Sequence, residues 1–417
     1  MSSIKSTLFL TVILATVLCS CKSNKAIKSE IIDLDNPVES IEIKLSDIVS
    51  DMTFVPLQTS NDLLLNVSAG SSIITDKSIF TTSNDGIYQF DREGNFIRKV
   101  VSKGNGPNEF SSIRKMLVDE KRDILYLSEF SSYGRIKRLN ISTSEAMEPI
   151  DFENNNYNIQ EIDNNGIIYG VVNRSIRIGS DEPEKPIENI IAFVYDPTDE
   201  TITKIYGKHD NTSYILQGVL KFDGNNMLFL GMGYADTLFR LRNNILSPIA
   251  PISLLEKIID IQAGGKEFDI INYAKNNIIG SIRYRKVNIT TGSDGNVSGI
   301  TVLNSPEQYL TVDADNIVRD ISAIYIDQLD YKIDLEEILE RQKEAAANGA
   351  AGITVAPGNT SGRSILTSPP TQSGKYLFWV VQPEDFKELI EGKQQFEALN
   401  NSINEDDNQI FIIGKIK

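Results

Sequence analysis

The sequence predicts an all-β fold: a six-bladed β-propeller closed by N- and C-terminal strands in one blade, with two short helical insertions. From Leu45 onward, short apolar runs recur between Asn, Asp and Gly turns, and helical periodicity is almost absent until about residue 334. The runs group in fours. Residues 86–110 hold two alternating strands, an Asp-x-x-Gly turn and a glycine-rich corner, as the outer half of a propeller blade requires.

The N-terminus predicts a targeting segment. Lys5 is the only charge before residue 22, and the apolar run Leu8–Leu18 is too short to span a bilayer, which fits a signal peptide. The run ends in Leu18-Cys19-Ser20-Cys21, which resembles a bacterial lipobox. That resemblance implies cleavage after residue 20 and acylation of Cys21, and an ordinary signal peptide is the alternative. We expect a signal peptide over 1–20, a lipid-anchored tether over 21–44 and the propeller over 45–417.

The positions of the cysteines and the net charge limit the cellular locations and the kinds of binding partner that we expect. Both cysteines lie in the targeting segment, so the mature domain would have no disulfide and no thiol nucleophile. No acidic run follows Cys21. In gut-type Gram-negative bacteria such a run often marks surface export, so we expect an outer-membrane lipoprotein that faces the periplasm rather than the cell surface. The net charge of −16 disfavours nucleic acid and leaves membrane attachment to the lipid.

Four groups of four strands can be read directly. They are 72–75, 78–83, 86–91 and 96–101; 113–119, 123–129, 134–140 and 146–152; 158–162, 166–173, 189–196 and 201–207; and 214–222, 226–232, 236–242 and 245–250. A fifth, irregular group spans 268–313. For the sixth we expect Asp320–Asp327, Lys375–Pro383 and Gln409–Lys417, joined by Met52–Gln58 as the outermost strand. Joining both ends of the chain in one blade would close the ring, and Pro56 is tolerated at such an edge.

Two segments interrupt the strand pattern. Apolar residues at helical spacing predict helices over 334–348 and 383–400, and a Gly/Ser/Pro-rich loop follows the first helix. We therefore expect insertions over 328–374 and 383–408. The second would lie on the face where the inner strands begin, called the top face here, and the first on the opposite face. Trp379 lies in an apolar strand and is expected in the core.

The chain resembles the six-bladed propeller lipoproteins of Bacteroides-type bacteria, with NHL-like or TolB-like blades. The resemblance rests on the stretches 43–59, 90–110, 235–241 and 405–417. Gln409 departs from it, because the group usually has proline there. Most members of the group have no assigned function, so the resemblance implies a fold and a location rather than a reaction.

Catalytic motifs are scarce. The single histidine, His209, lies in a polar loop, and the sequence has no Gly-x-Ser-x-Gly elbow, phosphate loop or EF-hand loop. We expect no cofactor. Calcium is the exception to consider, because some six-bladed propellers are calcium-dependent lactonases or esterases. Oxygen ligands would come from Glu109, Glu129 and Asp236, with Asn173 and Asp320 nearby, although acidic residues at strand ends also cap turns.

Ligand binding at the top face is the leading expectation, because loops on a rigid scaffold collect binding residues. Cations and tyrosines expected there could bind an anion, a sugar acid or a sugar ring. They are Lys103, Arg114, Tyr133, Arg135, Arg174, Arg177, Tyr234, Arg283 and Arg285. Ordinary salt bridging is the alternative for any one of them. The expected function is a binding or interaction module for a glycan, a peptide or a protein. The alternatives are a calcium-dependent hydrolase and a structural subunit of an outer-membrane assembly.

Overall fold

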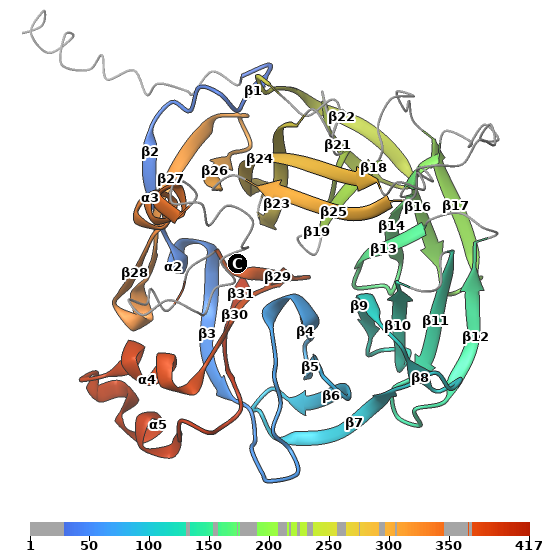
Figure 1. The fold of residues 1–417 in the computed structure, drawn as a ribbon, viewed down its shortest axis with the longest axis vertical. Helices are drawn as coiled ribbons and strands as arrows, with labels where there is room; N and C mark the ends of the chain where they lie inside the picture. Colours follow the sequence, from blue (N-terminus) through green and yellow to red (C-terminus); the bar gives the residue numbers. More distant parts are fainter. Residues whose placement is uncertain are drawn as a thin grey trace, which may run out of the picture.

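Six β-sheets stand around a central axis in the computed structural model, and they form the six blades of a propeller (Figure 1). The structure describes residues 29–130, 134–152, 157–172, 174–175, 190–206, 215–216, 218–222, 226–231, 237–256, 264–274, 276–291, 297–304, 307–345, 366 and 369–417. The all-β, six-bladed prediction is confirmed.

The first four blades follow the predicted strand groups. Blade one contains β4 (Ser72–Ile74), β5 (Ser78–Ser83), β6 (Gly86–Asp91), β7 (Phe96–Lys103) and β8 (Glu109–Phe110). Blade two contains β9 (Ile113–Asp119), β10 (Ile124–Glu129), β11 (Arg135–Asn140) and β12 (Ala146–Asp151). Blade three contains β13 (Tyr157–Ile162), β14 (Ile168–Val172), β16 (Ile190–Asp196) and β17 (Thr201–Tyr206). Blade four contains β19 (Gly218–Phe222), β20 (Met227–Gly231), β21 (Thr237–Arg242) and β22 (Ile245–Ser253). Two short strands form a separate small sheet. β15 (Arg174–Ser175) lies between β14 and β16 of blade three, and it pairs with β18 (Ile215–Leu216), which lies between blades three and four in the sequence.

Local chemistry explains the turn and the corner of blade one. The Asp91 carboxylate accepts hydrogen bonds from the Glu93 and Asn95 backbone N–H groups, at 3.0 and 2.8 Å, and Gly94 adopts a φ of +89°. At the corner, the Gly106 N–H donates to Glu109 Oε2 at 2.8 Å. A Cβ on Gly104 would lie 2.0 Å from that same oxygen, so a larger residue there would displace the Glu109 carboxylate from the corner.

Blade five is larger than predicted and takes one strand from blade six. It contains β23 (Gly265–Ala274), β24 (Asn277–Thr291), β25 (Val297–Asn304), β26 (Gln308–Val312), β27 (Val318–Ile326) and β28 (Tyr331–Asp334). The segment Asp320–Asp327, expected in blade six, lies almost wholly in β27, because β27 pairs with β26 in a hairpin. The insertion that follows therefore connects blade five to blade six, whereas the expected strand groups placed it between two strands of blade six.

Blade six closes the ring as predicted. Its order is β29 (Thr371–Ser373), β30 (Tyr376–Val381), β31 (Ile410–Ile416) and β3 (Val49–Pro56). The outermost strand β3 comes from the N-terminal part of the chain and pairs antiparallel with the C-terminal β31. Strands from the two ends of the chain thus pair in one sheet, which closes the ring between the first and last blades.

The segment expected to be a tether is partly built into the propeller. Residues 21–28 lie outside the described residues, but β1 (Ile32–Asp33) adds to β22 and β2 (Ser40–Lys44) adds to β27, both in parallel. Ile32 and Leu34 are fully buried in the core between blades four and five. We call residues 29–48 the strap, since they run along the outer edges of these two blades (Figure 1). Burial of apolar side chains explains why this part does not remain a solvated tether.

The helices are short. After α2 (Leu45–Ile48), α3 (Leu335–Ala345) matches the first predicted helix. The second is broken into α4 (Pro383–Ile390), a 3₁₀ turn at Gln394–Phe396 and α5 (Glu397–Ser402). Gly392 interrupts it with a φ of +71°. No helix among the described residues has the length and hydrophobicity to cross a bilayer.

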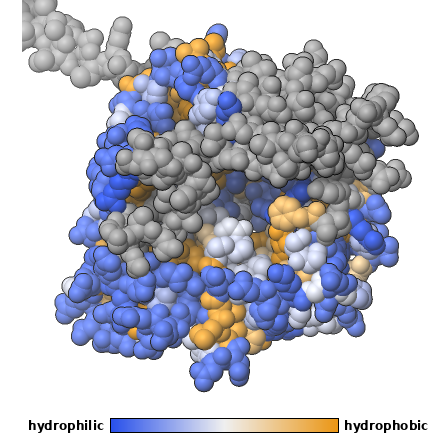
Figure 2. Space-filling view, viewed as in Figure 1, coloured by the Kyte–Doolittle hydropathy of each residue, from blue (hydrophilic) through white to orange (hydrophobic). Residues whose placement is uncertain are grey.

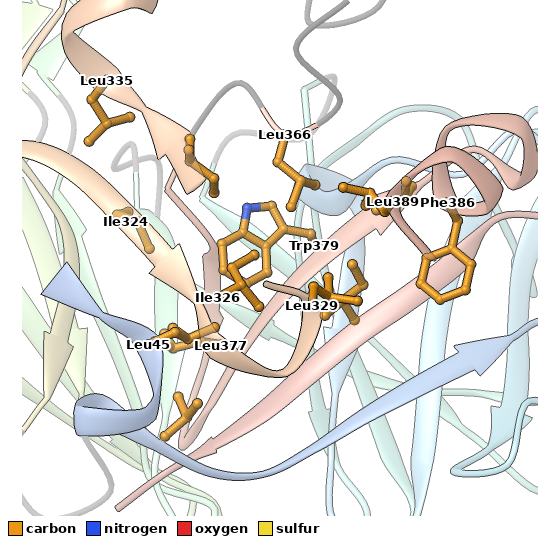
Figure 3. Packing of buried hydrophobic residues seen from close by; sticks show 14 of the residues in the cluster. Leu45, Ile324, Ile326, Leu329, Leu335, Leu366, Leu377, Trp379, Phe386 and Leu389 are labelled. Atoms are coloured by element: carbon orange, nitrogen blue, oxygen red, sulfur yellow. The ribbon is translucent and has the colours of Figure 1, made fainter. Parts of the chain in front are cut away.

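The largest hydrophobic cluster joins these helices to blades five and six (Figure 3). Trp379 of β30 lies in it beside Leu366 and Ile326, so the prediction that this tryptophan is a core residue is confirmed. Phe386 and Leu389 bring α4 onto the same cluster. The insertions are therefore packed parts of the propeller.

Candidate binding site

The predicted acidic ligands of blades one and two accept hydrogen bonds from their own chain. Glu109 caps the glycine corner through Gly106. Glu129 is buried, accepts from the Ser111 backbone N–H at 2.7 Å, and lies 3.4 Å from Lys137 Nζ. Lys137 also donates to the Glu109 backbone carbonyl, which links the two residues. Within the described ranges, no group of three or more His, Cys, Asp or Glu side chains could hold a metal ion.

The predicted cations of the same two blades are spread over the surface. Lys103 and Arg135 are exposed. The Arg114 guanidinium is half-buried and lies 5.1 Å from the centre of the Phe130 ring, which is 56% exposed. An exposed aromatic ring with a cation over it can take part in recognition.

Arg283, predicted to bind an anion, is held by two carboxylates. Its Nε lies 2.6 Å from Glu267 Oε1 and its Nη1 2.8 Å from Glu307 Oε1. Burial lowers the pKa of Arg283, but the two carboxylates outweigh burial and raise it overall. Its charge is thus compensated inside blade five.

Cys21, Tyr133, Asn173, Arg177, His209, Tyr234 and Asp236 lie outside the described residues, and so do the side chains of Arg174 and Arg285. Asp320, the remaining oxygen candidate, accepts a hydrogen bond from Gln308 at 2.6 Å on the outer part of blade five.

A different set of charged residues lies on the inner strands. Lys115 is on β9, Glu161 on β13, Lys221 on β19 and Asp269 on β23, four neighbouring strands around the axis. We call these four residues the charge ring. All four side chains are half-buried. None of them forms an ion pair within 4.0 Å in the described part of the molecule.

Strand register shows where these side chains point. Lys115 shares a sheet face with Leu117, which packs in the cluster between blades two and three. Glu161 lies opposite Tyr169, which packs toward blade four. Lys221 lies opposite Leu228, in the cluster between blades four and five. Each of these three side chains therefore faces the next blade, and positive and negative charges alternate from blade two to blade five.

Burial dominates the electrostatics of the ring. It lowers the pKa of Lys115 and raises the pKa of Glu161, and the mutual attraction of the two charges opposes both shifts without cancelling them. Burial likewise raises the pKa of Asp269, against the attraction of Lys221. Burial thus disfavours the charged forms, and no ion pair within 4.0 Å in the described part of the chain offsets this cost, a pattern typical of functional sites.

Polar contacts, called the floor here, join β29 to the ends of two inner strands. Gln372, on β29, donates to the backbone carbonyls of Phe222 at 2.9 Å and Tyr273 at 3.0 Å. Its Oε1 accepts from the Tyr273 N–H at 2.8 Å. These partners end or nearly end their inner strands, and Figure 1 shows β29 projecting toward the middle of the ring. Glu161 and Lys221 each stand one residue before the end of their strands, near this floor, whereas Lys115 and Asp269 stand four and five residues before the ends of theirs.

The charge ring was not among the predicted site residues. A signal was present: Lys221 stands between Leu220 and Phe222, and Asp269 between Phe268 and Ile270. A charge flanked by buried apolar residues inside a strand marks a position with a special environment. Figure 2 shows that the described surface on the viewed face is mainly hydrophilic, with hydrophobic residues gathered toward its middle.

Comparisons with known proteins identify the family of the chain and a solved structure of similar fold. A family model described as a domain of unknown function, DUF4934, matches residues 29–313. A Bacteroides fragilis protein that is described as exported is similar in structure, with a TM-score of 0.51 and 13% identity, over 93% of this chain and 99% of that one. A DUF4221 member from Bacteroides vulgatus has a TM-score of 0.44 and 11% identity, over 89% and 98% of the chains. No curated protein matches the chain.

Proposed function

The chain belongs to the DUF4934 family and folds as a six-bladed propeller, and from this premise we propose that it is an extracytoplasmic, lipid-anchored binding module. Its ligand, a glycan, a peptide or part of a protein, approaches from the top face and contacts the inner strands at the axis.

One observation carries this proposal. Four charged side chains on consecutive inner strands are half-buried without an ion pair in the described part of the chain. Unpaired charges near the interior cost free energy, and a ligand that pairs with them offsets that cost only when it is bound. Ligand sites typically combine mostly apolar walls with a few convergent polar groups, as the inner strands do here.

The extracytoplasmic location rests on the sequence and on one relative. The lipobox-like residues Leu18–Cys21 favour acylation of Cys21. The Bacteroides fragilis protein of similar structure is described as exported. A lipid anchor at the N-terminus would attach the propeller through the strap, with the periplasmic side of the outer membrane as the proposed site.

A thermal-shift screen tests the binding function. The soluble chain from Lys22 to Lys417, which holds every described residue, is heated with sugars, sugar acids, peptides and calcium. A ligand at 100 times its Kd adds about 2.7 kcal/mol to the stability of the folded state. We expect a shift with an organic ligand. The shift should be lost in Lys115→Met and retained in Lys343→Met, a matched change on the exposed face of α3.

Two results would contradict the proposal. A shift with calcium alone would favour the calcium-dependent hydrolase. No shift with any compound, together with co-purification of the native lipoprotein with a membrane assembly, would favour the structural subunit.

A further inference from the structure

The charge ring has a specific pattern that bears on the chemistry of its ligand. Its signs alternate around the axis in the order Lys115, Glu161, Lys221 and Asp269. The ring as a whole is therefore neutral, in a chain of net charge −16. A ligand with one charge would be attracted by two members of such a ring and repelled by the other two.

The four groups are close enough to interact but too far apart to form ion pairs. Glu161 is attracted by both Lys115 and Lys221, and Asp269 by Lys221. No pair of them comes within 4.0 Å among the described residues. Partial solvation remains, since each side chain is half-buried.

The floor bears on the approach of the ligand. The hydrogen bonds of Gln372 to Phe222 and Tyr273 join β29 to the ends of two inner strands. Asn272 of β23 donates to the Pro370 carbonyl at 3.1 Å and adds to the same floor. We expect a ligand to enter from the opposite end of the inner strands, the top face, and a compact charged group suits the positions of Glu161 and Lys221 beside the floor.

We infer that the charge ring binds a small zwitterion, a molecule with one ammonium and one carboxylate group, such as an amino acid or a short peptide. The lysines receive the carboxylate, and Glu161 and Asp269 receive the ammonium group. This inference rests on the proposed binding function and names the chemical class of its ligand. Paired charges in a partly desolvated site contribute more to affinity than exposed pairs do.

Isothermal titration with the Lys22–Lys417 chain tests the inference. The probes are the free amino acids and alanyl-alanine, each compared with its N-acetyl derivative, which lacks the ammonium charge, and its amide, which lacks the carboxylate. We expect at least one zwitterion to bind, and each derivative to bind about ten-fold more weakly or worse.

Variants then assign each charge to its partner. In the double variant Lys115→Met/Lys221→Met, the amide should bind as well as the parent zwitterion, because both groups that receive the carboxylate are gone. In Glu161→Gln/Asp269→Asn, the same should hold for the N-acetyl derivative, because both groups that receive the ammonium are gone. Lys343→Met and Glu340→Gln, on exposed residues of α3, should leave all affinities unchanged. Circular dichroism confirms that each variant is folded.

The outcomes separate this inference from the proposed function. If no zwitterion binds, but a compound from the thermal-shift screen binds in a Lys115-dependent way, the zwitterion is wrong and the binding function stands. If a zwitterion and its derivatives bind equally, the inference is also overturned. If no compound in either set depends on Lys115 or Glu161, both proposals fail.

Discussion

At the scale of single residues, Glu161 combines burial with a charge that has no ion pair within 4.0 Å in the described part of the chain. It lies half-buried on β13, faced by Lys115 of β9 and Lys221 of β19, and burial raises its pKa against the attraction of both lysines. A carboxylate in this state weakens the fold when it is ionised. Residues kept at the expense of stability are typical of functional positions.

The raised pKa of Glu161 predicts that Glu161→Gln increases the free energy of unfolding, and that the increase depends on pH. The folded-state pKa is raised above the unfolded value, so the ionised carboxylate destabilises the fold at pH 7, and the variant should be more stable by about 0.5–2 kcal/mol. As the pH falls through the folded-state pKa, the wild type takes up the proton and the difference should vanish by about pH 4. Urea unfolding between pH 4 and 8 measures this, with Glu340→Gln as the neutral control. A loss of stability at pH 7 would contradict the account.

Arg283, in contrast to Glu161, is expected to stabilise the fold. It bridges Glu267, whose side chain is 5% exposed, and Glu307. Arg283→Gln should lower the free energy of unfolding by about 2 kcal/mol, somewhat less than the ~3–5 kcal/mol for breaking a fully buried ion pair. Arg135→Gln, an exposed arginine of β11, should change it by less than about 0.5 kcal/mol. Equal effects of the two substitutions would show that Arg283 has no structural role.

The contacts of single residues were the least predictable feature of the sequence. Arg283 and Glu129 were predicted as ligand-binding residues because their types suit that chemistry, and their observed partners depend on the strand register between β23 and β24 and between β9 and β10. Lys221 was not predicted because the neighbours of a side chain on an inner strand depend on the assembled ring. Neighbouring members of the charge ring are 46 to 60 residues apart in the sequence, so a local pattern does not show that they meet.

At the scale of elements, turns and strands were predictable from local chemistry. The hairpin at Asp91–Gly94 and the corner at Gly104–Pro107 have the geometry that their residue types dictate. The assignment of Asp320–Asp327 to blade six was wrong because the fifth group, 268–313, holds an additional strand, β25, which pairs with β24 outside the usual order of four, so β27 was counted into the next blade. The second helix is broken because Gly392 adopts positive φ, which a pattern of apolar spacing does not detect.

Gly94 gives an element-scale prediction about ring closure. Its carbonyl accepts from the Gln58 N–H at 2.8 Å, and a Cβ would lie 2.1 Å from the Pro56 carbonyl oxygen of β3. Gly94→Ala should cost more than about 2 kcal/mol, because about 1 kcal/mol of left-handed strain adds to a clash with the closing strand.

Gly392→Ala is the matched control for this prediction. Gly392 also has positive φ, but no atom lies within 4 Å of its Cβ position, so only the strain of about 1 kcal/mol should remain. Thermal unfolding of the two variants compares them directly. A cost for Gly94→Ala no greater than for Gly392→Ala would mean that the contact between blade one and β3 is not tight.

At the scale of the whole molecule, the strap joins the proposed anchor to the propeller. Ser29 donates from its backbone to Asp315 at 2.8 Å, and β1 and β2 then cover the edges of blades four and five. Covered edges suit a protein that must remain folded without disulfides.

Cys21→Ala tests the anchor. The variant should lose lipid attachment, leave the outer-membrane fraction and retain its signal peptide, whereas Cys19→Ala should behave as wild type. Membrane fractionation and the mass of the isolated protein report both properties. Membrane retention of an unacylated Cys21→Ala protein would contradict the lipoprotein assignment.

The central claim is that the axis of the propeller binds a small ligand through the charge ring. The most direct measurement isolates the wild-type protein and the Lys115→Met/Glu161→Gln double variant from the native host, denatures both, and identifies the released small molecules by mass spectrometry. The account predicts a compound that the wild type carries and the variant lacks. The same set of compounds from both proteins would contradict it.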